Sequence, residues 1–124
     1  MTDAETNIDF AKMDGLVPAV AQDAKTLEVL MVGFLNETSY AKTLETGFVT
    51  FWSRTRQKLW MKGETSGNRL RVIDAVTDCD QDTLLFRVEV EGDGLVCHEG
   101  TVSCFTRPIA LRSGARVEAE EVRS

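Results

Sequence analysis

Short apolar runs of strand length, each closed by a turn, constrain the fold of this 124-residue chain more than any other feature. The six runs occupy residues 16–22, 29–35, 48–53, 58–62, 70–76 and 83–90. A polar turn at 23–26 joins the first two runs, which predicts a β-hairpin. Glycine-containing polar segments at 63–68 and 91–94 predict loops. The chain is therefore expected to be strand-dominated.

One segment predicts a short helix. Asn36 is a suitable N-cap, the helix would run through Tyr40 to Leu44, and Gly47 would end it. Lys42 lies toward the C-terminal end, where the helix dipole favours a cation. The expected fold class is α+β: a small single domain with a mixed or antiparallel sheet and one clear short helix.

Length and composition predict a single cytoplasmic domain. The 124 residues fit one domain over 1–124, with a core at about 14–107 and a charged tail at 112–124. No apolar run approaches the roughly 20 residues of a membrane span. The acidic N-terminus also lacks the basic and apolar regions of a signal peptide. The net charge of -6 disfavours nucleic-acid binding, which depends on neutralised phosphates.

The charge is unevenly distributed. Residues 46–73 contain one acid, Glu64, and six basic residues. The basic residues are Arg54, Arg56, Lys58, Lys62, Arg69 and Arg71. The segment could attract an anion, although a solvated strand face would show the same spacing.

Three aspartates at alternate positions form the first candidate metal site. In an extended backbone Asp78, Asp80 and Asp82 would share one face. Three converging carboxylates repel one another unless a cation is present, and Mg²⁺ prefers oxygen ligands. A surface acidic turn is the alternative. An EF-hand is disfavoured because Thr83 stands where the calcium loop needs glycine.

All three cysteines and the only histidine lie within the 27 residues from Asp78 to Cys104. The spacing of Cys79, Cys97 and Cys104 is not that of a zinc finger, and free cysteines are often simply buried. Three thiolates would nevertheless leave a fourth zinc position open for water or substrate. His98 could close that position, but on a strand it would face away from Cys97, which favours an acid, base or substrate contact.

Three segments, at 52–68, 78–85 and 97–105, closely resemble the phosphoribosyl-AMP cyclohydrolase family, the third-step enzymes of histidine biosynthesis. The resemblance covers roughly residues 14–107 and departs from the family at Gln81 and Glu99, positions expected to vary. It implies a monofunctional form, without the pyrophosphohydrolase domain that some members carry fused behind.

The resemblance also implies a mechanism. Water opens the N1–C6 bond of the purine of 1-(5-phosphoribosyl)-AMP, giving the phosphoribosyl-formimino-AICAR phosphate product. Zinc at Cys79, Cys97 and Cys104 would supply hydroxide, and His98 would move protons. Magnesium at the three aspartates would help to bind the substrate. In the family the zinc site is completed across a homodimer, with Cys79 of one chain meeting the other two cysteines of its partner.

Guanidinium groups and backbone amides suit the substrate's two phosphates. The candidate substrate-binding residues are Trp52, Ser53, Arg54, Arg56, Lys62, Glu64, Ser66, Gly67 and Asn68. The alternative from another class is a non-enzymatic interaction module in which a closed zinc site only staples a small β-domain. A deaminase-like zinc hydrolase is disfavoured because the chain lacks the H-x-E and P-C-x-x-C signature.

Overall fold

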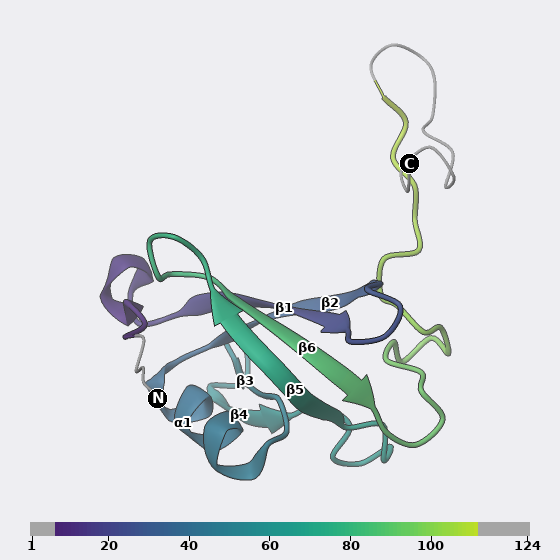
Figure 1. Ribbon diagram of the computed structural model, residues 1–124, viewed down its shortest axis with the longest axis horizontal. Coiled ribbons are helices and arrows are strands. Elements are labelled where there is room, and N and C mark those ends of the chain that lie inside the picture. The colour runs from purple at the N-terminus through teal and green to yellow at the C-terminus, as the bar shows by residue number, and fades with distance from the viewer. Residues whose placement is uncertain (1–6, 112–124) are drawn as a thin grey trace.

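The computed structural model describes residues 7–111 (Figure 1). Its strands are β1 (Val17–Asp23), β2 (Val29–Leu35), β3 (Thr50–Ser53), β4 (Lys58–Met61), β5 (Leu70–Thr77) and β6 (Leu84–Val90). One α-helix, α1 (Glu37–Thr46), follows β2, and a 3-10 helix, η1 (Phe10–Met13), precedes β1. The expected charged tail at 112–124 lies outside the described residues.

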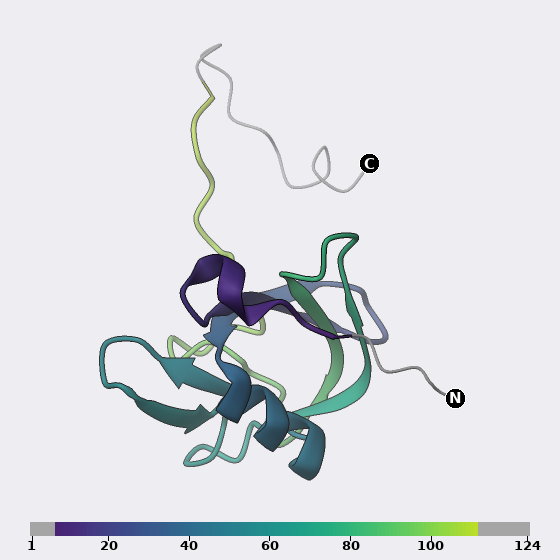
Figure 2. The ribbon, with the colours of Figure 1, turned by 90° about the vertical axis from the view of Figure 1, so that its left-hand side faces the viewer.

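Four strands form one mixed sheet in the order β2-β1-β6-β5. β1 runs antiparallel to β2 and parallel to β6, and β5 runs antiparallel to β6. β3 and β4 form a separate two-stranded hairpin. Figures 1 and 2 show α1 and this hairpin on the same side of the sheet. The strand-dominated, mixed-sheet class with one helix is confirmed.

The core lies between the four-stranded sheet and the layer formed by α1 and the β3–β4 hairpin. Alternate residues of β1 and β6 point into it, because successive side chains of a strand face opposite sides. Val17, Ala19, Phe86 and Val88 are fully buried in this way. Phe51 of β3 completes the contact from the other layer and is 1% exposed.

Both ends of α1 are those expected from the sequence. Asn36 Oδ1 accepts from Ser39 N at 2.9 Å, and Ser39 Oγ accepts from Asn36 N at 3.0 Å, which forms a capping box. Gly47 takes the left-handed conformation with φ of 82° and donates to Thr43 O. The interpretation of Lys42 is wrong, because the last turn contains no basic residue and Lys42 pairs with Glu45 at 3.5 Å.

The predicted β1–β2 hairpin is confirmed. Asp23 Oδ1 accepts from the amides of Lys25 and Thr26, at 2.8 and 2.9 Å, and so closes the turn. The strand expected from residue 48 begins later, because Phe48 forms only an isolated bridge with Arg71. Within residues 7–111, no helix has the length and apolar character needed to cross a lipid bilayer.

Candidate active site

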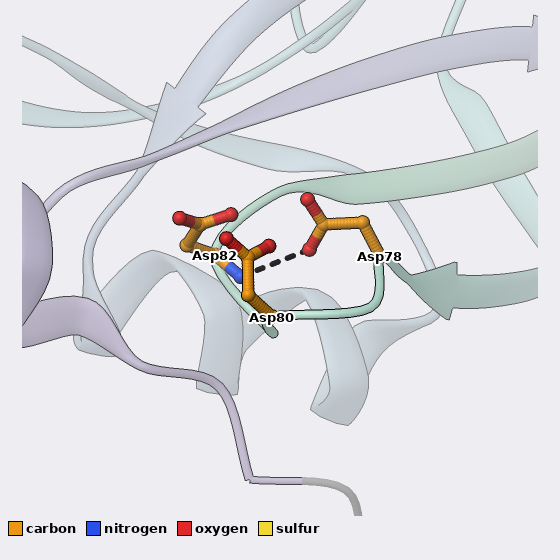
Figure 3. Close-up of side chains that lie close together, drawn as sticks. All are labelled: Asp78, Asp80 and Asp82. Atoms are coloured by element: carbon orange, nitrogen blue, oxygen red, sulfur yellow. Dashed lines mark hydrogen bonds between the residues drawn. The ribbon is translucent and has the colours of Figure 1, made fainter.

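The carboxylate oxygens of Asp78, Asp80 and Asp82 lie within 4.8 Å of one another, in the turn between β5 and β6 (Figure 3). The expected extended backbone is wrong here. Gln81 takes a left-handed conformation with φ of 66°, and its amide donates to Asp78 O. The carboxylates converge because the chain turns around them: Asp78 Oδ1 accepts from the amides of Asp82 and Thr83, at 3.0 and 3.2 Å.

Crowding of the carboxylates separates their pKa values. The pKa of Asp82 is raised, first by desolvation and then by hydrogen bonding and repulsion with Asp80 and Asp78. Desolvation also acts to raise the pKa of Asp78. Hydrogen bonds from the Asp82 amide, from the neighbouring carboxyl groups and from the Thr83 amide outweigh it, so the pKa of Asp78 is lowered. A positive charge close to the three carboxylates would therefore stabilise their ionised forms.

Lys12 of η1 supplies one such charge. Its Nζ lies 3.5 Å from both Asp80 Oδ2 and Asp82 Oδ2 and donates to Asp80 O at 2.9 Å. The amide of Asp9 donates to Gln81 O and holds η1 against the turn. One ammonium group against three carboxylates leaves two negative charges, which matches a divalent cation. The sequence gives no local signal for Lys12, which lies 68 residues before Asp80.

Cys97 and Cys104 form a second cluster, in the loop after β6. Each of the two thiols affects the pKa of the other. The Cys97 amide donates to Thr101 O at 3.0 Å, and the Cys104 amide donates to Leu30 O at 2.8 Å, which fixes the loop to β2. The buried Ser103 reinforces this attachment by donating to Val29 O at 2.7 Å.

The two thiols titrate differently. The pKa of Cys97 is lowered, chiefly by a hydrogen bond from the Glu99 backbone and then by the Thr101 hydroxyl. The pKa of Cys104 is raised, first by burial and then by the negative charge of Cys97, although Lys62 opposes the rise. A pair of thiols is a suitable ligand set for a soft metal ion, because metal binding displaces the thiol protons.

His98 lies in a turn, so the expectation that strand alternation directs its side chain is wrong. Gly100 N donates to Cys97 O at 2.9 Å, and Gly100 has a φ of 87°, which closes a β-turn with His98 at its second position. The imidazole is exposed, and no described residue hydrogen-bonds to it. It is therefore available to a substrate next to the thiol pair.

Cys79 lies apart from the other two thiols. It is exposed in the aspartate turn between β5 and β6, whereas Cys104 is attached to β2. Among the described residues, the sulfur atoms of the three cysteines do not all lie within 4.8 Å of one another. A zinc–sulfur bond is about 2.3 Å long. Among residues 7–111, only the three aspartates form a group of three converging metal ligands.

The β3–β4 hairpin carries the first four candidate substrate-binding residues. Trp52 and Ser53 end β3, and Ser53 Oγ accepts from the Arg56 amide at 3.2 Å. The Arg54 guanidinium lies 4.1 Å from the ring centroid of Phe34. Lys62 follows β4 and acts electrostatically on Cys104. We call this hairpin, with Arg54, Arg56 and the following Lys62, the basic hairpin. Its Lys62 brings positive charge close to Cys104 of the thiol pair.

The loop at 63–68 is held by Asn68. Asn68 Nδ2 donates to Leu95 O at 3.0 Å, and its Oδ1 accepts from the Asp93 amide at 2.8 Å. A Cβ on Gly92 would lie 2.1 Å from that Oδ1, so the two loops are closely apposed. Asn68 therefore positions the loop, while Glu64, Ser66 and Gly67 remain exposed on it.

Two arginines of the basic segment are neutralised within the chain. Arg69 pairs with Glu91 at 3.1 Å, and Arg71 pairs with Glu89. Among the described residues, Arg54, Arg56 and Lys62 form no ion pair. The positive charge open to an anion therefore lies on the hairpin and its flank.

Known proteins match the chain over most of its length. A family model described as phosphoribosyl-AMP cyclohydrolase matches residues 31–106. A phosphoribosyl-AMP cyclohydrolase of Solibacter usitatus is 60% identical over 101 residues, which is 82% of this chain and 79% of the relative. One from Lactiplantibacillus plantarum is 52% identical over 107 residues, covering 86% of this chain and 97% of the relative.

A longer relative matches over part of its length. The histidine biosynthesis bifunctional protein HisIE of Bacteroides thetaiotaomicron is 55% identical over 98 residues, which is 79% of this chain and 47% of that protein. The matched residues 31–106 include the aspartate turn, the thiol pair and the basic hairpin. The chain belongs to the phosphoribosyl-AMP cyclohydrolase family, enzymes of histidine biosynthesis.

Proposed function

We propose that the chain opens the N1–C6 bond of 1-(5-phosphoribosyl)-AMP with a zinc ion and a magnesium ion. Within the family, the observation that supports this mechanism is that Cys97 and Cys104 lie in one loop, fixed to β2 by the Cys104 amide, and affect each other's pKa, with the cationic Lys62 acting on Cys104. Soft thiolates suit zinc, and the three hard carboxylates with their net double negative charge suit magnesium. Both donor sets fit the ions assigned to them.

Zinc bound by the cysteines would act as a Lewis acid that lowers the pKa of water to about 7. Proton transfer is carried out by a residue of the chain itself. His98, in the turn beside Cys97, accepts a proton from the water that attacks C6. It returns the proton to N1 as the N1–C6 bond breaks, and the second proton of the water passes to the exocyclic imine nitrogen, which becomes the nitrogen of the new carboxamide.

The basic hairpin binds the substrate's phosphates. Arg54 and Arg56 present guanidinium groups from the β3–β4 turn, and Lys62 presents an ammonium group near Cys104. Trp52, Ser53, Glu64 and the loop residues Ser66 and Gly67 would contribute further contacts, with the Ser66 backbone amide as a phosphate donor; the Gly67 amide already donates to Gly63 O at 2.8 Å. Asn68 holds this loop against the loop at 91–95. The carboxylate cluster would hold magnesium and so help to bind and orient the polyanion.

The zinc site is completed across a homodimer in this proposal, with Cys79 of one chain and Cys97 and Cys104 of another. Its support is that the three thiols do not converge within the described part of one chain. A reducing compartment such as the cytoplasm keeps all three thiols available. A closed structural zinc site would need four protein ligands in one cluster. The described loop after β6 supplies two thiols, those of Cys97 and Cys104.

The proposed function is tested by assaying phosphoribosyl-AMP hydrolysis beside metal analysis. The purified chain is expected to hold about one zinc per subunit and to lose activity on chelation. Zinc together with magnesium should restore the activity, whereas magnesium alone should not. A metal-free preparation with full activity would refute the mechanism.

Asp80→Asn tests the magnesium site. The amide keeps the shape of the side chain but removes one of the three negative charges, so we expect the magnesium concentration for half-maximal activity to rise roughly tenfold. Zinc content should be unchanged. Asp93→Asn, an isolated exposed aspartate in the loop at 91–94, is the matched control. Superimposable magnesium titrations of Asp80→Asn and the parent would show that the assignment is wrong.

A further inference from the structure

Lys12 is the basic side chain that the fold brings to the aspartate turn. Its Nζ lies 3.5 Å from both Asp80 Oδ2 and Asp82 Oδ2, and it donates to Asp80 O at 2.9 Å. Among residues 7–111, no other basic side chain forms an ion pair with the three aspartates of Figure 3. The side chains of Lys12 and Asp80 are 39% and 57% exposed, so a cation from solvent can reach the same carboxylates.

Contacts outside the carboxylates hold Lys12 in this place. The Asp9 amide donates to Gln81 O at 2.8 Å, which ties the start of η1 to the aspartate turn. The Phe10 ring packs against Tyr40 of α1, with the ring centroids 5.7 Å apart. Neither contact uses an aspartate of the cluster. The helix η1 therefore keeps Lys12 beside the turn whether or not a metal ion is bound.

A divalent ion at the carboxylates would meet the Lys12 ammonium group. Asp80 and Asp82 are candidate metal ligands, and both already pair with Lys12 through Oδ2. Mg²⁺ binds oxygen ligands at about 2.1 Å, so an ion held by these carboxylates would lie a few ångströms from Nζ. Two positive charges at that separation repel each other. Lys12 therefore competes with the ion for the carboxylates.

The same ammonium group changes the charge that a substrate meets. Three ionised carboxylates and Mg²⁺ together carry one negative charge, and Lys12 brings the sum to zero. The proposed substrate carries two phosphate groups, which a negatively charged site would repel. Lys12 thus has two opposite effects, because it weakens the binding of the ion and removes a repulsion from the substrate.

We infer that Lys12 is the charge-balancing residue of the carboxylate site, which lowers the affinity for the divalent ion and favours binding of the polyanionic substrate. The inference rests on the proposed function, because it takes the three aspartates as the magnesium site. It adds a residue of η1 that belongs to neither ligand set. Lys12 also lies outside residues 31–106, which the family model matches.

Lys12→Met tests the inference, because methionine keeps most of the side-chain length and removes the charge. In calorimetric titrations of the zinc-loaded protein with magnesium chloride at low salt, the dissociation constant for Mg²⁺ should fall roughly tenfold. The difference from the parent should largely disappear at about 1 M sodium chloride, where charges are screened beyond about 3 Å. At saturating magnesium, KM for phosphoribosyl-AMP should rise about threefold or more, with kcat nearly unchanged.

Three further variants separate charge from shape. Lys12→Gln, which is neutral but keeps an N–H donor, should behave as Lys12→Met does. Lys12→Arg restores the charge and should return both constants to within about twofold of the parent. Lys25→Met removes an exposed lysine of the turn at 23–26 and should change neither constant. The Lys12 side chain is partly exposed, so the fold should tolerate each change, as circular dichroism would verify.

The outcomes distinguish this inference from the proposed function. If Asp80→Asn weakens magnesium binding while the neutral Lys12 variants bind magnesium as the parent does or more weakly, the magnesium site stands and the role of Lys12 is wrong. Weaker binding would make Lys12 a support of the turn alone. An unchanged KM in the neutral variants at saturating magnesium would also overturn the inference. If neither Asp80→Asn nor Lys12→Met alters the titration, the magnesium site fails and the inference fails with it.

Discussion

Cys97→Ala is expected to release the zinc and to lower kcat/KM by about 10³-fold or more. Cys97 is one of two candidate zinc ligands in the loop after β6, and a Lewis acid lowers the barrier by several kcal/mol, at about 1.4 kcal/mol for each tenfold change in rate. Cys104→Ala should behave in the same way. Zinc content and the hydrolysis rate are measured on the same preparations.

Val102→Ala is the control for both cysteine variants. Val102 is exposed in the same loop and contributes only its backbone carbonyl, which accepts from the Val96 amide. It should keep its zinc and its activity. Zinc retained at about one per subunit in Cys97→Ala would remove Cys97 from the ligand set.

His98→Ala is expected to keep its zinc and its oligomeric state yet to lose roughly 10²- to 10⁴-fold in kcat, the usual contribution of a positioned acid or base. The turn that closes on Gly100 N and Cys97 O depends on backbone atoms, so the loop should survive the substitution. Glu99→Gln, the neighbouring exposed residue in the same turn, should change kcat by only a few fold. Zinc lost in parallel with activity would make His98 a ligand and the site closed.

Local signals in the sequence predicted the elements of the fold. Asn36 and Gly47 mark the ends of α1 because capping depends on the residues at the ends themselves. The turn at 23–26 joins two apolar runs, and the hairpin follows. The parallel pairing of β1 with β6 had no such signal, because more than 60 residues separate Ala19 from Leu84 and each run suits several partners.

The sequence predicted that the three aspartates converge but not the backbone geometry that brings them together. Asp78, Asp80 and Asp82 converge through a tight turn rather than by strand alternation. The turn depends on a left-handed conformation at Gln81, and glutamine is not a residue type that predicts such a conformation. Lys12 reaches the same cluster from a distant helix. Asn68 was expected at the phosphates, yet both polar atoms of its side chain bind backbone groups of the loop at 91–95.

The most direct test of the shared zinc site is complementation between two inactive chains. Cys79→Ala and Cys97→Ala are each expected to form inactive homodimers, because every site lacks one thiol. In a mixed dimer one site loses both thiols and the other keeps all three. Allowed to exchange subunits in equal amounts, the two variants should recover about a quarter of the parental activity, since half of the dimers are mixed and each has one intact site. No recovery despite demonstrated subunit exchange would contradict a site divided between two chains.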